Sequence, residues 1–247
     1  MEIRKENTGY LDIHSHILPG VDDGAKNLKE TREMLQIMYE QGVRNIITTP
    51  HSYPNQPKKS SEKLRNLVLQ IEEEAKSISE DFQIFTGNEI LYRESIPEEI
   101  EKGTILTLAD TQYLLVEFLP EEHYTRIFHG IKRIVEYGYC PIIAHMERVE
   151  ALYENVDRIQ EIIGCGAYLQ VNTGSMPGGM FHKKTNYLCK LIGKGYIHFL
   201  GSDCHNTTTR PPRMEETVKR IRKKVPKEAL EKILYKNPKK LLNKQYI

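Results

Sequence analysis

Short apolar runs alternate with helical patterns along the whole chain, and this alternation limits the choice of fold. Runs such as Tyr113–Phe118 and Pro141–Ala144 are almost entirely apolar, which is typical of parallel strands covered on both faces. Seven such runs occur, at Tyr10–His14, Val43–Thr49, Gln83–Gly87, Tyr113–Phe118, Pro141–Ala144, Tyr168–Val171 and Tyr196–Leu200. Helical patterns lie between and after them, at Asn27–Gln41, Ser60–Ser79, Ile96–Lys102, Glu122–Tyr137, Asn155–Ile163, Lys183–Lys194, Pro212–Lys224 and Lys227–Tyr235.

The same alternation predicts one α/β domain. No linker rich in proline or serine and no low-complexity tract divides residues 1–247. Seven strand–helix units favour a closed, TIM-like barrel over an open sheet, although periodicity alone fits both architectures.

Charge and composition exclude several classes of protein. The 35 Lys+Arg residues balance 34 Asp+Glu residues to a net charge of +1, which argues against a protein that wraps nucleic acid or coats anionic membranes. No apolar run approaches the roughly 20 residues of a membrane-spanning helix. The charged residues 1–7 lead into no apolar signal segment, and the four cysteines form no CxxC pair. We therefore expect a cytoplasmic protein with free thiols and no membrane insertion.

Side chains that can bind metals follow six of the seven runs, where the carboxyl ends of parallel strands open on one face. They are His14, His16, His51, Glu89, Glu117, His145, Asp203 and His205. Asp22 and Asp23, in the loop after the first run, are candidate additional ligands. Imidazole suits Zn²⁺, Mn²⁺ or Fe²⁺, and carboxylates can bridge two ions. The pattern predicts a site for more than one metal ion.

Structural roles compete with this interpretation for any single residue. An isolated histidine can be a hydrogen-bonded residue of the core or of a loop. Glu117 could pair with a lysine, but a buried charge inside an apolar run favours a metal or another cation. Four histidines lie away from the predicted strand ends and are expected to be structural: His123, His129, His182 and His198.

Six segments together resemble a known superfamily. They are DIHSHILPGVDDGA, TTPH, GNEI, LLVEF, IIAHMERV and GSDCHNTTTR. In this order they are similar to the polymerase-and-histidinol-phosphatase (PHP) superfamily, and within it to the CpsB/YwqE-type bacterial protein-tyrosine phosphatases. The similarity runs from about residue 10 to residue 240. It implies a distorted (β/α)7 barrel with two or three metal ions, usually Mn²⁺, for which Fe, Zn, Co or Mg could substitute.

The resemblance also implies roles for individual residues. The first ion would be held by His14, His16, Glu89 and Asp203. Glu89 would bridge to a second ion on Glu117 and His145. The third ion would be held by His51, His205 and either Asp22 or Asp23, a choice that stays open. Arg148 and Arg210 would grip the phosphate as catalytic and substrate-binding residues. Met146 stands where these phosphatases commonly have proline, which leaves the position of the Arg148 loop open.

The implied reaction is hydrolysis of phosphotyrosine by a metal-activated hydroxide. The implied partner is the tyrosine-rich C-terminal tail of a bacterial tyrosine autokinase that controls capsule or exopolysaccharide synthesis. The basic segment 210–224 is either a solvated helix face or a guide for such an acidic tail. The native metal, the physiological substrate and the oligomeric state are not determined by the sequence.

Other functions remain as alternatives. Cys204 and Arg210 have the C-x5-R spacing of thiolate phosphatases, but the three threonines Thr207–Thr209 resist the backbone angles of a phosphate-binding loop. Asp203 would also raise the pKa of the Cys204 thiol. A phosphatase of small phosphomonoesters shares the metal motifs, whereas the neutral charge disfavours a nuclease. The predicted ligands and both arginines argue against a non-enzymatic, metal-bound regulatory module.

Overall fold

Nine parallel strands among the described residues form the centre of the molecule. The structure is a computed structural model that describes residues 9–54, 60–177 and 182–247, so the N-terminal prediction for residues 1–7 lies outside it. A three-stranded sheet contains, in order, β1 (Tyr10–Ser15), β2 (Val43–Thr48) and β4 (Gln83–Thr86). A six-stranded sheet contains, in order, β3 (His51–Ser52), β5 (Glu89–Leu91), β6 (Tyr113–Glu117), β7 (Cys140–Ile143), β8 (Tyr168–Asn172) and β9 (Phe199–Gly201). Every neighbouring pair in both sheets is parallel.

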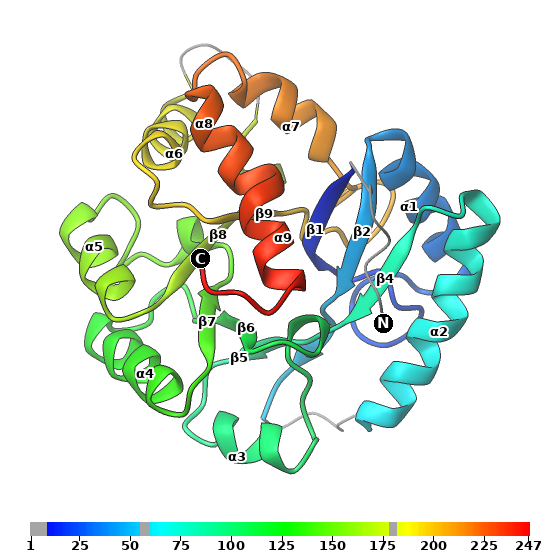
Figure 1. Ribbon diagram of the computed structural model, residues 1–247, viewed down its shortest axis with the longest axis horizontal. Coiled ribbons are helices and arrows are strands. Elements are labelled where there is room, and N and C mark those ends of the chain that lie inside the picture. Colours follow the sequence, from blue (N-terminus) through cyan, green and yellow to red (C-terminus); the bar gives the residue numbers. More distant parts are fainter. Residues whose placement is uncertain (1–8, 55–59, 178–181) are drawn as a thin grey trace.

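The two sheets together make one curled barrel of seven strand positions (Figure 1). The short strands β3 and β5 follow β2 and β4 after breaks of two residues, so each continues the path of its predecessor. On the other side, β1 lies beside β9, where the His16 N–H donates to Cys204 O at 3.0 Å and the Asp203 N–H donates to His14 O at 2.8 Å. The predicted α/β barrel is confirmed.

Helices surround this barrel and cover one of its ends (Figure 1). They are α1 (Leu28–Glu40), α2 (Ser61–Ile78), α3 (Ile96–Glu101), α4 (Tyr124–Glu136), α5 (Val156–Gly164), α6 (Lys183–Gly193), α7 (Met214–Ile221), α8 (Lys227–Glu231) and α9 (Asn237–Leu242). Three 3₁₀ turns, η1 (Leu108–Asp110), η2 (Met146–Arg148) and η3 (Thr173–Ser175), and the π-helical turn η4 (Lys232–Lys236) complete the set. The last predicted helix is longer than the sequence pattern indicated, because η4 joins α8 to α9 across the pattern's end at Tyr235. Within the described ranges, no helix combines the length and apolarity needed to cross a bilayer.

Successive residues along a strand belong alternately to two hydrophobic clusters. Leu115 and Ile142 belong to a cluster inside the barrel, whereas their neighbours Leu114 and Ile143 pack in the larger cluster under the helices. This division follows from the two-residue repeat of a strand. Leu241 of α9 also packs in the inner cluster, so α9 fills one end of the barrel.

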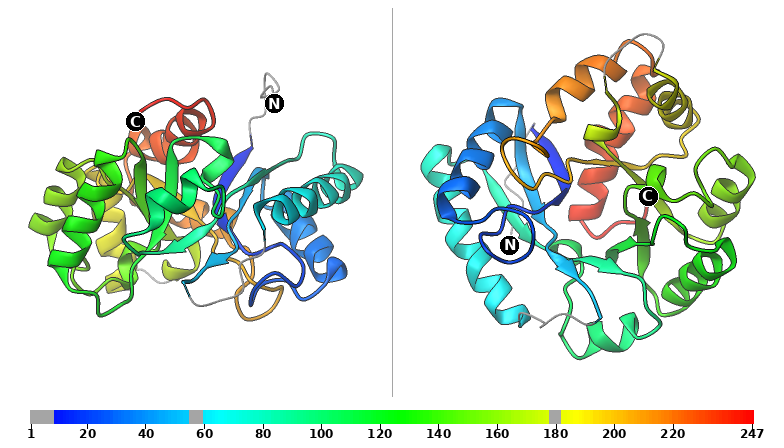
Figure 2. Two further views of the ribbon diagram at one scale, coloured as in Figure 1. Left: turned by 90° about the horizontal axis from the view of Figure 1, so that it is seen from below. Right: turned by 180° about the vertical axis from the view of Figure 1, so that it is seen from behind.

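The end that α9 closes is the one where the strands begin. The Tyr113 hydroxyl, at the start of β6, donates to the Gln245 carbonyl at 2.8 Å. In Figure 2 the C-terminus lies at the opposite end of the barrel from the loops that follow β1 (blue) and β9 (orange). The carboxyl ends of the strands are therefore the open end.

His198, one of the histidines predicted to be structural, provides a test of stability against pH. The Leu169 N–H donates to its Nδ1 at 3.1 Å, and burial lowers the pKa of His198 to about 4. In the unfolded chain the pKa is about 6.5, so the unfolded state binds the extra proton as the pH falls. This contribution to stability is present above about pH 6.5 and is lost as the pH falls towards 4.

In His198→Asn the amide oxygen can accept the same hydrogen bond but does not titrate. As the pH falls from about 7.5 to about 5, we expect the unfolding free energy of the wild type to decrease by about 2 kcal/mol more than that of this variant. Urea unfolding of both proteins in chelator measures this difference. An identical pH dependence in the two proteins would contradict the argument.

Candidate metal centre

Four side chains from three strand ends surround one point at the open end of the barrel. The Nε2 atoms of His14 and His16 are 3.2 Å apart. Each of these atoms lies 3.3 Å from Glu89 Oε2 and 3.5 Å from Asp203 Oδ1. Four ligands held about 2.1 Å from one ion would lie about 3.4 Å from one another, which matches this spacing. All four residues are buried.

Glu89 also faces a second group of ligands. Its Oε1 is 2.7 Å from His145 Nε2, which lies 3.5 Å from Glu117 Oε1. Its Oε2 is 2.9 Å from His51 Nδ1. One carboxylate thus has an oxygen towards each of two neighbouring groups, as a bridging ligand requires.

The loop after β1 supplies a third group, and there its two aspartates differ. Asp23 Oδ1 lies 3.3 Å from His51 Nε2 and 3.4 Å from His205 Nε2. The carboxylate of Asp22 is instead fully engaged: it accepts from His16 Nδ1 at 2.8 Å, from the Gly24 N–H at 3.0 Å and from the His51 N–H at 3.1 Å. A carboxylate on Nδ1 fixes an imidazole with its Nε2 free for a metal.

Buried polar atoms without hydrogen bonds test whether these residues fit metal ions. Among the described residues, Glu89 Oε2, Glu117 Oε2 and His205 Nε2 are buried and accept or donate no hydrogen bond. Leaving such atoms unpaired costs about 1–3 kcal/mol each. Metal coordination would satisfy all three, so the donor set fits a cluster of cations.

The charges of the cluster depend on one another. Burial lowers the pKa of His16, but its hydrogen bond with Asp22 and its contact with the Glu89 carboxylate outweigh this effect and raise the pKa to about 10. Although burial opposes it, contact with the histidines, His14 first, holds the pKa of Glu89 well below its usual range. Protons on the imidazoles thus balance the carboxylates, and a bound cation would displace them.

Two amides on β8 connect the first and second groups, and sequence reasoning missed both. Gln170 Oε1 accepts from the His145 N–H at 2.8 Å and from His14 Nδ1 at 3.3 Å. Gln170 Nε2 donates to Asn172 Oδ1 at 2.8 Å, and Asn172 Nδ2 donates to Asp203 Oδ2 at 2.6 Å. Their position in the sequence could have identified them. Gln170 is a polar residue inside the sixth apolar run and Asn172 directly follows that run, just as Glu117 is a polar residue inside the fourth run.

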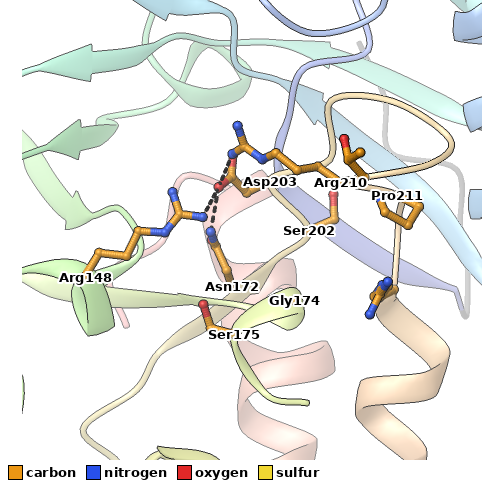
Figure 3. A pocket seen from close by; sticks show the side chains of 10 residues that line it. Arg148, Asn172, Gly174, Ser175, Ser202, Asp203, Arg210 and Pro211 are labelled. Atoms are coloured by element: carbon orange, nitrogen blue, oxygen red, sulfur yellow. Dashed lines mark hydrogen bonds and ion pairs between the residues drawn. The ribbon is translucent and has the colours of Figure 1, made fainter. Parts of the chain in front are cut away.

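Beside this cluster lies a cavity of about 220 Å³, which we call the arginine pocket (Figure 3). Its lining residues are Arg148, Asn172, Gly174, Ser175, Ser202, Asp203, Thr209, Arg210, Pro211 and Arg213. Asp203 Oδ2 accepts from Arg148 Nη2 at 2.9 Å and from Arg210 Nη2 at 2.6 Å. Met146, which stands where the related phosphatases commonly have proline, is buried in the larger hydrophobic cluster under the helices. The turn η2 nevertheless brings Arg148 to the site.

Comparison with known proteins places the chain in a family. Residues 10–243 match the family described as capsular polysaccharide synthesis, CpsB/CapC. The chain belongs to the CpsB/CapC family.

Two relatives of known name are similar to the chain over most or all of their length. The tyrosine-protein phosphatase CpsB of Streptococcus pneumoniae is 36% identical over 242 residues, which cover 96% of this chain and 100% of the relative. The tyrosine-protein phosphatase YwqE of Bacillus subtilis is 33% identical over 247 residues, 96% of this chain and 93% of the relative. The resemblance expected from the six segments is therefore confirmed.

Solved structures agree with this assignment. A crystal structure from a study of B. subtilis YwqE and S. pneumoniae CpsB, described as unique metal-dependent tyrosine phosphatases, superposes with a TM-score of 0.87 at 30% identity and covers 96% of each chain. The phosphotriesterase homology protein of Escherichia coli, at 16% identity and a TM-score of 0.63, shares the fold. It covers 96% of this chain and 99% of its own.

Cys204 is poorly placed for thiolate chemistry in this CpsB/CapC chain. It is completely buried, and burial together with the charge of Asp12 raises the pKa of its thiol. The backbone N–H groups of the loop are also engaged: Asn206 Oδ1 accepts from Thr208 at 3.0 Å, Thr209 at 2.8 Å and Arg210 at 3.1 Å. They are turned away from any phosphate, so the C-x5-R spacing does not form a phosphate cradle here.

The remaining histidines lie outside the cluster, as expected for structural residues. His182 Nδ1 accepts from the Thr185 N–H at 3.4 Å and caps α6, while His123 and His129 lie at the start of α4 and within it. Tyr53 is a different case, because its ring stacks on His51 with centroids 4.8 Å apart. An aromatic ring therefore borders the candidate centre.

Proposed function

We propose that this chain is a metal-dependent protein-tyrosine phosphatase. The observation that carries the proposal is the position of Asp203, whose Oδ1 faces the histidine cluster while its Oδ2 binds Arg148 and Arg210. A cation site and two phosphate-binding guanidinium groups thus share one carboxylate. The names of the relatives, tyrosine-protein phosphatase CpsB and YwqE, support the same activity.

The ligands are assigned from the three groups. His14, His16, Glu89 and Asp203 would hold the first ion; Glu89, Glu117 and His145 would hold the second; His51, Asp23 and His205 would hold the third. Asp22 orients His16 and is not a ligand. Because all donors are imidazole or carboxylate, we propose Mn²⁺ as the native metal, with Fe, Zn, Co or Mg as substitutes. Bound ions supply a water of lowered pKa and neutralise charge on the phosphoryl oxygens.

The arginines hold the substrate. Arg148 and Arg210 are about two-fifths exposed, so each guanidinium can turn from Asp203 Oδ2 to the non-bridging phosphoryl oxygens. Arginine remains charged at all physiological pH values and binds such oxygens through two parallel N–H groups. The leaving phenolate has a pKa of about 10, so we assign no residue as a general acid.

We further propose that the physiological substrate is the phosphorylated C-terminal tail of a bacterial tyrosine autokinase in capsule or exopolysaccharide synthesis. The capsular role of the family supports this choice. An open pocket beside the cluster suits an extended, flexible tail.

Hydrolysis of a phosphotyrosine peptide by the wild type and by Cys204→Ser, with chelator and with added manganese, tests the activity. We expect both proteins to lose turnover in chelator and to regain it with manganese, because the buried thiol takes no part. Turnover that is unchanged by chelator but absent in Cys204→Ser would contradict the metal mechanism. If only small phosphomonoesters were hydrolysed, the substrate class would be wrong while the metal centre stood.

A further inference from the structure

The arginine pocket carries more positive charge than one phosphoryl group needs. Arg148 and Arg210 already converge on Asp203 and are assigned to the phosphate. Arg213 is the third arginine in the lining. Across the described parts of the chain, its guanidinium has no carboxylate partner and no hydrogen bond. This cation is therefore available to a ligand in the pocket.

The backbone around Arg213 is held firmly, although its side chain is exposed. Pro211 and Pro212 precede it and fix their own φ angles. Gln41, at the end of α1, donates from Nε2 to the Pro212 carbonyl at 2.7 Å and accepts from the Glu215 N–H at 3.3 Å. Arg213 itself is the N-cap of α7. The guanidinium thus extends from a fixed point, which reduces the entropy lost when it binds.

Its neighbours on α7 are neutralised, which distinguishes Arg213 from a general basic surface. Lys219 Nζ lies 2.8 Å from Glu215 Oε1, and Arg220 pairs with Glu216. Arg220 also donates to the Met176 carbonyl. Both cations of α7 therefore have a carboxylate partner on the helix itself, whereas the guanidinium of Arg213, at the pocket, has none among the described residues.

We propose that Arg213 forms a subsite for the carboxylate of an aspartate or glutamate close to the phosphotyrosine in the substrate. This inference rests on the proposed function. The planar guanidinium fork matches a carboxylate and can bind both of its oxygens. Arg210 and Arg213 are three residues apart in the chain, and successive Cα atoms are about 3.8 Å apart. An acidic residue near the phosphotyrosine can therefore reach Arg213 while the phosphate binds Arg210. Gly174, also in the lining, has open space where a Cβ would lie, so a peptide can pass that wall.

Two phosphotyrosine peptides that differ only in one flanking glutamate or glutamine provide the test. We expect the manganese-loaded wild type to prefer the glutamate peptide by about tenfold in kcat/KM, mainly through KM, as a charged hydrogen-bonded pair allows. Arg213→Gln should remove this preference, and Arg213→Lys should restore part of it. Arg222→Gln is the matched control, because it removes the same charge from the end of α7 without lining the pocket. It should keep the preference.

Three outcomes would overturn the subsite and leave the phosphatase activity intact. They are equal kcat/KM values for the two peptides in the wild type, a preference that survives Arg213→Gln, or a preference lost equally in Arg222→Gln. Failure of the loaded wild type to hydrolyse either peptide would overturn the proposed function and the subsite with it. Salt gives a separate readout, because screening should reduce a preference that depends on charge.

Discussion

Asp203→Asn is expected to reduce hydrolysis of phosphotyrosine peptides by about a thousandfold or more while the barrel stays folded. The carboxylate contributes an oxygen to the first metal group, and its other oxygen positions Arg148, Arg210 and Asn172. Asparagine keeps the shape of the side chain and tolerates the left-handed backbone at this position, where φ is 53°. Only the negative charge and one acceptor oxygen are lost. Initial rates with saturating manganese, together with circular dichroism, measure the two expectations.

Asp110→Asn is the matched control for this variant. Asp110 also has a left-handed backbone, with φ of 54°, and its Oδ1 binds Arg65 at 2.6 Å, but it lies in η1 away from the metal groups. We expect its phosphatase activity to remain close to that of the wild type. Substantial turnover by Asp203→Asn, or an equal loss in Asp110→Asn, would contradict the assignment of Asp203.

The second large effect is expected from Glu89→Gln, which should lower the number of bound manganese ions by more than one. Glu89 Oε2 lies within 3.3 Å of imidazole nitrogens of His14, His16 and His51, and Oε1 reaches His145. The amide of glutamine could not take the place of a carboxylate shared by the first and second groups, because its nitrogen is not a ligand and its charge is zero. Isothermal titration of the metal-free protein measures the stoichiometry directly.

Glu117→Gln separates a bridging role from an ordinary one. Among the ion pairs of the described residues, Glu117 takes part in one, with His145 of the second group. This variant should therefore lose at most one ion. Its pKa is raised by burial and by the charge of Glu89, and therefore its loss should also disturb the metal-free protein less. Equal stoichiometries for the two variants would show that Glu89 does not bridge.

Much of the barrel and of the cluster could be predicted because two simple periodicities coincide. Apolar runs identify the strands, and parallel strands must expose their carboxyl ends on one face, so a histidine such as His51 is placed by its position in the chain. The breaks that create β3 and β5 were not predicted, since β2 and β3 form one continuous pattern in the sequence. The π-helical turn η4 was missed for a similar reason, because helical spacing does not distinguish it from an α-helix.

Other features depend on tertiary contacts that no local pattern shows. The sequence left Asp22 and Asp23 equivalent, and what separates them is the approach of His16 and the His51 N–H to Asp22. The amides of Gln170 and Asn172 have no charge to draw attention to them, and their importance comes from three partners on other strands. The left-handed backbone of His145, with φ of 32°, likewise lacks the glycine that would have indicated it.

The contact between β1 and β9 has a consequence for when the protein becomes active during its synthesis. Asp12 Oδ1 accepts from the Ser202 N–H at 2.9 Å, so the first and last strands are joined across most of the chain. Contacts between residues so distant in sequence form late, because a long loop must close before they stabilise anything. A ribosome-bound chain that has not reached Asp203 has no closed barrel and an incomplete first metal group. The order of translation thus leaves the site of the nascent chain incomplete until residues 203–205 have been added.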